Sequence, residues 1–273
     1  MVLSASYAHQ ANPIKLTVDD GRIKRCYHFR PGLGYDDLSM MNELDGNQDW
    51  LTFDRTLHEV LMAIGVPADE HQRKLMFIHY HRMVEANQRF NLTRITSVAD
   101  AAIKHYADSL TLLAIPDLDT TSPLRVLDVG TGAGFPSIPL AIVCGQWRFV
   151  AIDGTGKKVR FVAGAIDALN LSNIEARHSR AVNLLRQESG KYDLILLRAV
   201  SKLAEGLKEV HGLVRRGGQV VFYKTATISI EEQAEGNRAA EEDNLVALPA
   251  VDLVLPSPDG IIQRKLIRFG RLQ

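Results

Sequence analysis

The sequence predicts an α/β fold: a mostly parallel sheet with helices on both faces, preceded by a small helical portion. After Pro123, short apolar strands alternate with helical segments, and this alternation is typical of a parallel sheet with crossover helices. Ahead of that point the apolar residues recur at helical spacing, as in Leu57, Val60 and Leu61. A glycine-rich stretch at the end of the first strand marks where such a sheet binds its ligand.

These patterns divide the chain into three parts. Residues 1–53 contain glycine, proline and charge without a sustained period, which predicts an irregular extension of unknown role, with room for a hairpin. Residues 54–122 form the helical portion and a linker, and residues 123–273 form the α/β domain.

The elements follow from the periodicity. Helices are expected in the helical portion over residues 54–65, 69–90 and 97–115. Strands are expected over residues 125–130, 147–153, 173–179, 192–200, 219–225, 245–255 and 264–270. Helices are expected in the α/β domain over residues 136–144, 157–169, 202–214 and 228–244. The last two strands are joined by a segment too short for a helix, which predicts an antiparallel hairpin at one edge of the sheet.

Composition excludes several classes of protein. Of 273 residues, 46% are hydrophobic and 23% charged, as in an ordinary globular protein. No apolar run approaches the ~18 residues of a membrane span, and the first residues lack the pattern of a secretory signal. The two cysteines, Cys26 and Cys144, have no metal-ligand spacing. We expect a cytoplasmic protein without a metal or a membrane partner.

The net charge is zero, but the charges are unevenly distributed. Residues 228–244 hold six acids and one base, which leaves 31 bases against 26 acids elsewhere. Residues 261–271 add four bases and no acid. Such a basic remainder is compatible either with a surface for RNA or with an ordinary solvated face.

The glycine-rich stretch reads D-V-G-T-G-A-G, with Asp128 two residues ahead of Gly130, Gly132 and Gly134. Glycines allow the backbone to turn tightly and let a ligand approach it. The spacing G-x-G-x-G is one residue shorter than the dinucleotide fingerprint G-x-G-x-x-G. A second acid, Asp153, ends the next strand, where its carboxylate is placed to accept both hydroxyls of a ribose.

This arrangement resembles motif I and its partner acid in class I S-adenosylmethionine-dependent methyltransferases. The resemblance implies a Rossmann-like, seven-stranded, mostly parallel sheet with an antiparallel edge strand. It also implies that the loop wraps the amino acid end of the cofactor, with Asp128 facing the methionine ammonium. Two alternatives stay open: a strand-to-helix turn without a ligand, and a nicotinamide-dependent enzyme.

Further strings resemble one methyltransferase family. N-L-T (91–93), H-x-x-D-S (105–109) and G-F-P-x-I-P-L-A (134–141) occur in this order. Together they resemble the RsmG family, also called glucose-inhibited division protein B, over residues 54 to the end. The resemblance implies methylation of guanine N7 in the 530 loop of 16S ribosomal RNA, within the small ribosomal subunit.

The resemblance also implies a set of cofactor contacts. Carried over residue by residue, they are Gly130 and Phe135 in the loop, Asp153 at the ribose, Ala181 and Val182 beside the adenine, and Arg198 after the fourth strand. The chain departs from the family at Gly154, where the family has serine, and at Thr225, where it has glycine. These changes concern the ribose edge and local loop shape more than the class of reaction.

Arg198 stands where amino-group methyltransferases carry an N-P-P-Y-type motif. A cation at this strand end could position the reactants by holding the cofactor carboxylate, an RNA phosphate or the guanine O6. The alternative is a surface salt bridge.

Several polar residues are candidates for contact with RNA. His105, Asp108 and Ser109 fall on one helix face, which either packs on the α/β domain or closes over the cofactor and RNA. Three cations lie at a helix start, where they oppose the helix dipole: Lys157, Lys158 and Arg160. They either contact an RNA phosphate or are simply exposed to solvent. Asn91 and Thr93 are expected to fix a turn.

The expected chemistry needs alignment more than proton transfer. Guanine N7 carries an available lone pair and loses no proton on methylation, so no general base is required. We expect a monomer acting on RNA in the small subunit. The alternatives are a methyltransferase of the same fold acting on another RNA site or a small molecule, and a non-catalytic assembly factor that binds the cofactor. Residues 1–53 have two interpretations. They are either an artefact of a start assigned upstream of Met40 and Met41, or an RNA-binding arm.

Overall fold

The computed structural model describes residues 17–19, 22–24, 44 and 46–272. The chain divides into two compact units, residues 1–31 and 32–273. In the first unit β1 (Thr17–Asp19) and β2 (Arg22–Lys24) pair antiparallel, which confirms the hairpin predicted in the extension. The interpretations that concern Met40 and Met41 lie outside the described residues.

Two capped helices follow in the second unit. The helix α2 covers Gln48–Ala63, and it begins earlier than the sequence predicted because the Asn47 side chain accepts two backbone N–H groups at its start, at 2.9 and 3.0 Å. The helix α3 covers Glu70–Asn87, and Asp69 and Gln72 form a capping box at its start. The capping side chains, more than the apolar period, therefore set where these helices begin.

The third helix is continuous but not uniform. Four pieces follow one another: α4 (Val98–Ala101), the π-helical turn η1 (Ala102–Ala107), α5 (Asp108–Leu110) and the 3-10 turn η2 (Thr111–Ala114). The predicted extent is confirmed, whereas the π-helical turn was not anticipated. Such turns widen a helix locally and are frequent at functional sites.

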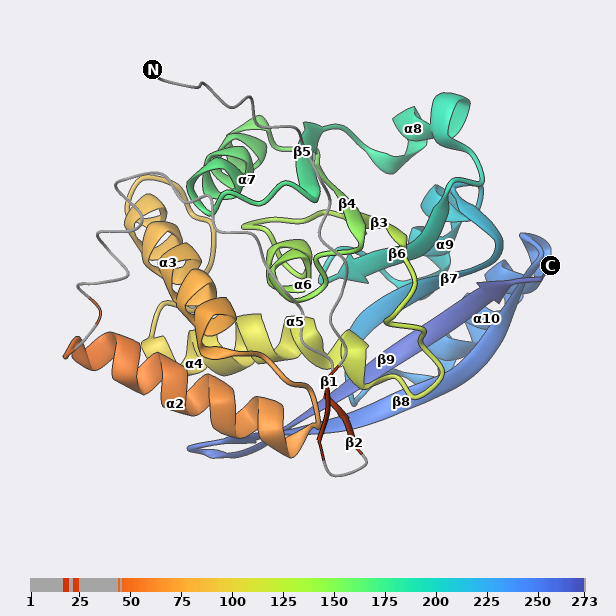
Figure 1. The fold of residues 1–273 in the computed structure, drawn as a ribbon. Coiled ribbons are helices and arrows are strands. Elements are labelled where there is room, and N and C mark those ends of the chain that lie inside the picture. Colours follow the sequence, from red (N-terminus) through yellow and green to blue (C-terminus); the bar gives the residue numbers. More distant parts are fainter. Residues whose placement is uncertain (1–16, 20–21, 25–43, 45, 273) are drawn as a thin grey trace, which may run out of the picture. The chain divides into compact units, whose positions relative to one another are not determined.

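Seven strands form one sheet in the order β5-β4-β3-β6-β7-β9-β8 (Figure 1). The strands are β3 (Arg125–Val129), β4 (Arg148–Asp153), β5 (Ile174–His178), β6 (Tyr192–Arg198), β7 (Val214–Thr225), β8 (Leu245–Ser257) and β9 (Gly260–Arg271). The first five are parallel, and β9 runs antiparallel to both β7 and β8. Strand order reverses at β3, so the crevice for a ligand is expected at the carboxyl ends of β3 and its neighbours.

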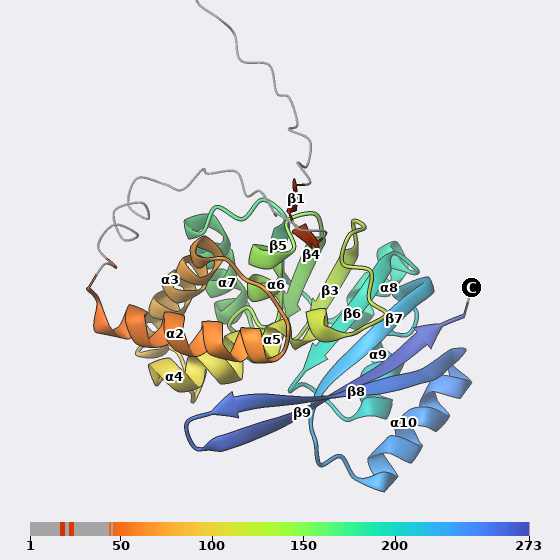
Figure 2. The ribbon, with the colours of Figure 1, turned by 60° about the horizontal axis from the view of Figure 1, so that its bottom comes forward.

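Helices cover both faces of the sheet (Figure 2). They are α6 (Ser137–Val143) and α7 (Gly156–Ala168) on one face, and α8 (Ala181–Glu188), α9 (Leu203–Val210) and α10 (Ile230–Glu242) on the other. The sequence did not predict α8, which is short and has few buried residues, mainly Ala181 and Leu184. The helix α3 packs on α6 and α7, and α2 contacts α3 and the edge strand β8.

The C-terminal edge is more extended than the sequence predicted. The hairpin β8–β9 turns over two residues only, between Ser257 and Gly260, instead of over the longer loop expected. The strand β7 begins at Val214 and α9 ends at Val210, so the predicted helix is too long at its C-terminal end. Gly217 and Gly218, a pair typical of a turn, lie within β7. Its pairing with β6 shifts register near Tyr192.

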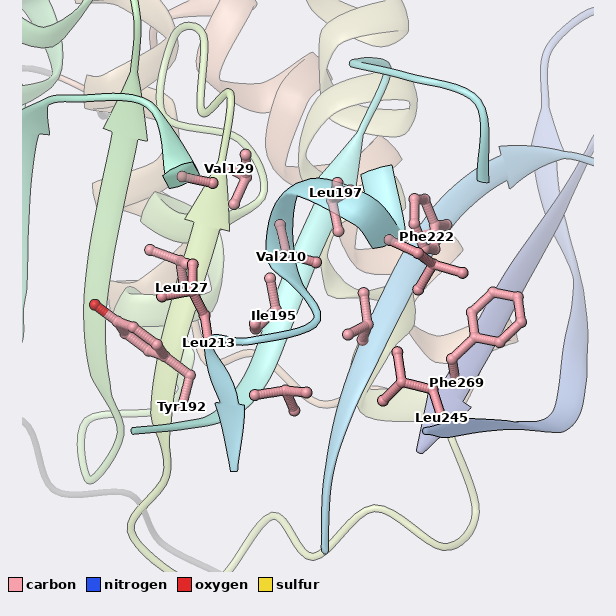
Figure 3. Close-up of a cluster of buried hydrophobic side chains, with 14 of the residues drawn as sticks. Leu127, Val129, Tyr192, Ile195, Leu197, Val210, Leu213, Phe222, Leu245 and Phe269 are labelled. Atoms are coloured by element: carbon pink, nitrogen blue, oxygen red, sulfur yellow. The ribbon is translucent and has the colours of Figure 1, made fainter. Parts of the chain in front are cut away.

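One cluster of the core lies between the sheet and the helices α8, α9 and α10. Figure 3 shows Leu127, Ile195 and Leu197 from the sheet facing Val210 of α9. These side chains are at most 2% exposed, and truncating one such leucine to alanine typically costs about 2–5 kcal/mol. This packing fixes the strand ends that carry the candidate site.

Candidate active site

The loop after β3 contains the three glycines, and all of them have positive φ: 76° at Gly130, 61° at Gly132 and 95° at Gly134. Residues with a side chain rarely adopt this conformation. The N–H groups of Gly130 and Thr131 both donate to Ile152 O at 2.9 Å. The loop is therefore a fixed strand-to-helix turn tied to β4.

Close packing also requires glycine in this loop. A Cβ at Gly130 would lie 2.2 Å from Val200 Cγ1, and a Cβ at Gly134 would lie 2.4 Å from Ile138 Cδ1. Val200, in the segment after β6, is exposed and was not singled out from the sequence. Its neighbour Ala199 has φ of 56°, unusual for a residue with a side chain and frequent at functional sites.

Asp128 is completely buried below the loop. The Ser137 N–H donates to its Oδ2 at 3.3 Å, whereas Oδ1 has no hydrogen-bond partner among the described residues. Burial raises the pKa of this carboxyl to about 7, although Ser137, Thr131 and Arg198 favour the charged form. A buried acceptor without a partner is costly, and a cationic donor from a ligand would satisfy it.

Asp153 ends β4 beside the glycine loop. It is 6% exposed, and it accepts the N–H groups of Gly132 at 3.1 Å and Thr155 at 2.8 Å. Lys158 Nζ lies 3.6 Å from Asp153 Oδ2. Lys158, proposed from the sequence as an RNA contact, is thus paired with this acid, and the carboxylate faces the glycine loop.

Arg198 ends β6, and its guanidinium is held by the third helix. It donates to Ser109 Oγ at 2.9 Å, to His105 O at 3.3 Å and to Lys104 O, and it pairs with Asp108 Oδ2 at 3.0 Å. The widened π-helical turn supplies the two carbonyls. Only 14% of the Arg198 side chain is exposed, so the salt bridge considered from the sequence exists but is internal.

The predicted helix face is buried. His105, Asp108 and Ser109 are at most 8% exposed, and His105 stacks on Phe135 with ring centroids 4.6 Å apart. Burial, aided by the positive charge of Arg198, lowers the pKa of His105 to about 3. These three residues pack the helical portion against the α/β domain, so the structure favours that alternative over direct contact with RNA.

Asp108 also pairs with a residue from the far end of the chain. Arg264 Nε lies 2.7 Å from Asp108 Oδ1, and 156 residues separate the two along the sequence. No pattern in the sequence predicts this pair. One buried carboxylate thereby joins the third helix, β6 and β9.

The other cations of the C-terminal tail are used internally as well. Arg268 is 2% exposed and pairs with Asp117 at 2.7 Å, Arg271 donates to two backbone carbonyls, and Lys265 pairs with Asp252 at 2.6 Å. The tail therefore holds the sheet together. The possibility that its charge forms an RNA surface is not supported.

The segment between β5 and α8 lies beside Asp153. The Ser179 N–H donates to Asp153 O at 3.3 Å, and Ala181 and Val182 open α8 directly afterwards. Ala181 is buried and Val182 is exposed. This placement brings the pair expected beside the adenine close to the acid expected at the ribose.

Exposed cations gather around the start of α7. Lys157, Arg160 and Arg180 are exposed, and none forms an ion pair with another residue of the described part of the chain. A Cβ at Gly154 would lie 3.7 Å from Arg180 Nε, and one at Gly156 would lie 3.6 Å from Arg160 Nη1. The sequence did not indicate Arg180 as a member of this cluster, because it is distant from the other two cations along the chain and comes near them only in the folded protein.

The opposite end of the sheet carries a separate cavity of about 510 Å³. It is lined by residues at the amino ends of the strands, among them Arg125, Arg148 and Asp193. Parallel sheets bind ligands at the carboxyl ends, so the glycine loop remains the candidate site. No group of His, Cys, Asp or Glu that could hold a metal ion occurs among the described residues. None of the described helices has the length and apolar character needed to cross a membrane.

Comparison with known proteins identifies the family. The family model described as rRNA small subunit methyltransferase G, or GidB, matches residues 72–254. The chain belongs to this family. Its fold is accordingly the class I S-adenosylmethionine-dependent methyltransferase fold predicted from the sequence, with the helical portion ahead of it.

Curated relatives carry the name ribosomal RNA small subunit methyltransferase G. The Deinococcus deserti protein is 41% identical over 160 residues, 58% of this chain and 64% of that protein. The Solibacter usitatus protein is 38% identical over 163 residues, 60% of this chain and 75% of that protein. The Lachnoclostridium phytofermentans protein is 34% identical over 183 residues, 66% of this chain and 75% of that protein.

Solved structures that resemble the chain are more distant. A precorrin-6y C5,15-methyltransferase from Geobacter metallireducens has a TM-score of 0.44 and 13% identity, covering 55% of this chain and 81% of that one.

Proposed function

We propose that this member of the GidB family transfers the methyl group of S-adenosylmethionine to N7 of a guanine in the 530 loop of 16S ribosomal RNA. The observation that carries the proposal is the buried Asp128 below the glycine loop, whose Oδ1 has no partner among the described residues. A cationic ligand group is the natural complement of such an acceptor. Family membership supplies the class of substrate.

The residues around the loop fit this cofactor. Asp128 would accept its ammonium and Asp153 its ribose hydroxyls. Gly130, Gly132, Gly134 and Phe135 would form the wall along its amino acid end, and Ala181 and Val182 would flank its adenine. When bound, the cofactor supplies an electrophilic methyl group attached to a sulfonium sulfur.

The protein's own part in the reaction is positioning. Arg198 holds the end of β6 to the third helix through Asp108 and Ser109, so it fixes the wall that faces the target base. His79 and His105 are buried, and burial lowers the pKa of each to about 3. Both imidazoles remain neutral near pH 7, which suits a reaction that removes no proton from guanine N7.

Exposed cations near the loop would hold the RNA. Lys157, Arg160 and Arg180 stand at the start of α7 and before α8, on the side of Asp153. Their charges are not neutralised by described residues, so they are free to contact phosphates. Lys158 is excluded from this set because it pairs with Asp153.

The test is methyl transfer from labelled S-adenosylmethionine to small ribosomal subunits that lack this modification. We expect 7-methylguanosine, identified by mass spectrometry and mapped to the 530 loop. Label at another nucleotide or on a small molecule would identify a different acceptor. Cofactor binding without transfer would indicate a non-catalytic assembly factor, and affinity for NAD without affinity for S-adenosylmethionine would overturn the cofactor assignment.

A further inference from the structure

The loop between α3 and α4, residues 88–97, presents an aromatic ring and two arginines to solvent. Phe90 is 37% exposed, and Arg89 and Arg94 are exposed beside it. Within the described part of the chain the Phe90 ring contacts no other aromatic ring, and neither arginine forms an ion pair. An exposed ring flanked by cations that pair with no acid among the described residues is available to a partner.

The loop is nevertheless held firmly. Asn87 Oδ1 accepts the N–H groups of Leu92 at 2.7 Å and Thr93 at 2.9 Å. The Tyr80 hydroxyl donates to Thr96 O at 2.7 Å. Asn87 therefore fixes this turn, a role that the sequence suggested for Asn91. Thr93 takes part in the turn as predicted. A ring presented by a fixed loop loses little freedom when it binds a partner.

The same loop reaches the candidate active site through two contacts. Thr93 Oγ1 shares a hydrogen bond of 2.9 Å with His105 Nε2, and His105 stacks on Phe135, the residue that closes the glycine loop. A macromolecule bound at residues 88–97 would consequently lie at the edge of the site where the methyl group is transferred.

We propose that this loop binds unpaired nucleotides of the RNA substrate, with Phe90 stacking on a base and Arg89 and Arg94 contacting the neighbouring phosphates. Single-stranded RNA is recognised by aromatic side chains that stack on splayed bases and by cations along the backbone. A docking site for a protein would instead offer a contiguous apolar patch, and here a single ring stands between arginines. The inference rests on the proposed function, since it assumes an RNA substrate.

The first experiment compares Phe90→Ala with Phe90→Trp in methyl transfer to unmodified small subunits. We expect Phe90→Ala to lower kcat/KM for the subunit about tenfold or more, mainly through KM, because one base loses its stacking partner. Affinity for S-adenosylmethionine should stay within about twofold of wild type, and Phe90→Trp should retain activity. Ile230→Ala is the matched control, because Ile230 is 84% exposed at the start of α10.

The second experiment measures how subunit binding depends on salt. Replacing Arg89 and Arg94 together by alanine should reduce the slope of log K against log salt by about 1.4, since each phosphate contact on a single strand contributes about 0.7. Arg238→Ala, an exposed arginine of α10, should leave the slope unchanged. A slope unchanged in the double variant would overturn the phosphate contacts.

A crosslink separates this inference from the proposed function. With the photo-crosslinker p-benzoylphenylalanine in place of Phe90, we expect attachment to ribosomal RNA. Attachment to a ribosomal protein alone, or Phe90→Ala behaving like Ile230→Ala, would overturn the inference while methylation by the wild type upholds the function. A wild-type protein that crosslinks to RNA through position 90 but transfers no methyl group would uphold the loop and overturn the function.

Discussion

The proposed contact of Asp128 with the cofactor predicts that binding depends on pH. Burial raises the pKa of its carboxyl to about 7, and the proposed role requires the ionised form opposite an ammonium group. At pH 6 about one Asp128 in eleven is ionised, and at pH 7.5 about three in four. Wild-type affinity for S-adenosylmethionine should therefore be about eightfold weaker at pH 6 than at pH 7.5.

The assay is calorimetric titration between pH 5.5 and 7.5, a range in which the amino group of the cofactor remains mainly protonated. Repeating it in buffers of different ionisation enthalpy would show the proton released by Asp128 on binding. Asp128→Asn should bind more weakly than wild type at pH 7.5 and lose the dependence on pH. Equal wild-type affinities at the two pH values, within about twofold, would refute the reasoning.

The raised pKa of Asp128 also predicts that the stability of the folded protein falls as pH rises, whereas cofactor affinity increases. Its pKa in the folded protein lies above the ordinary value of 3.8, so its contribution to stability is fully present below pH 3.8 and is lost as pH rises through 7. The gap between 3.8 and about 7, at about 1.4 kcal/mol per pH unit, corresponds to at most about 4–5 kcal/mol. Without cofactor, the Asp128→Asn variant should therefore have a higher melting temperature than wild type at pH 8. The difference in melting temperature should be smaller at pH 5.

Three further predictions concern the loop and its supports. Gly130→Ala should destabilise the protein by about 1–3 kcal/mol more than Gly132→Ala in urea unfolding, because only the former places a Cβ 2.2 Å from a neighbouring side chain; equal losses would contradict this. Asp108→Ala should cost about 3–5 kcal/mol, since it removes a buried carboxylate that pairs with two partly buried arginines, whereas Asp252→Ala, in a pair whose carboxylate is 69% exposed, should cost less than about 1 kcal/mol. Asp153→Ala should weaken cofactor binding at least tenfold by calorimetry, and unchanged affinity in a folded variant would remove this residue from the site.

Part of the fold was predictable because it is encoded locally. The parallel strands follow from their apolar runs, and the glycine loop follows from residues that need positive φ. The helix α8 was missed because only a few of its residues are buried. The length of β7 was missed because glycines at a register shift in the sheet read as a turn.

The candidate site was predictable only in part, because the pairing of charged residues depends on contacts that are not local in the sequence. Asp128 and Asp153 sit at the ends of consecutive strands, so the sequence alone indicates that they meet at one edge of the sheet. Whether a charged residue is free for RNA depends on its partners. Lys158 pairs with Asp153 and Arg268 with Asp117, while Arg160 stays unpaired among the described residues.

The sequence by itself determined the α/β architecture, the glycine loop and the acids at two strand ends, because periodicity and backbone requirements act over a few residues. The tertiary structure alone decided that Asp108 joins Arg198 to Arg264 and that His105 packs beneath Phe135. These contacts join residues far apart in the chain. Pairing, burial and the resulting pKa of each group exist only once the sheet and the helical portion have packed together.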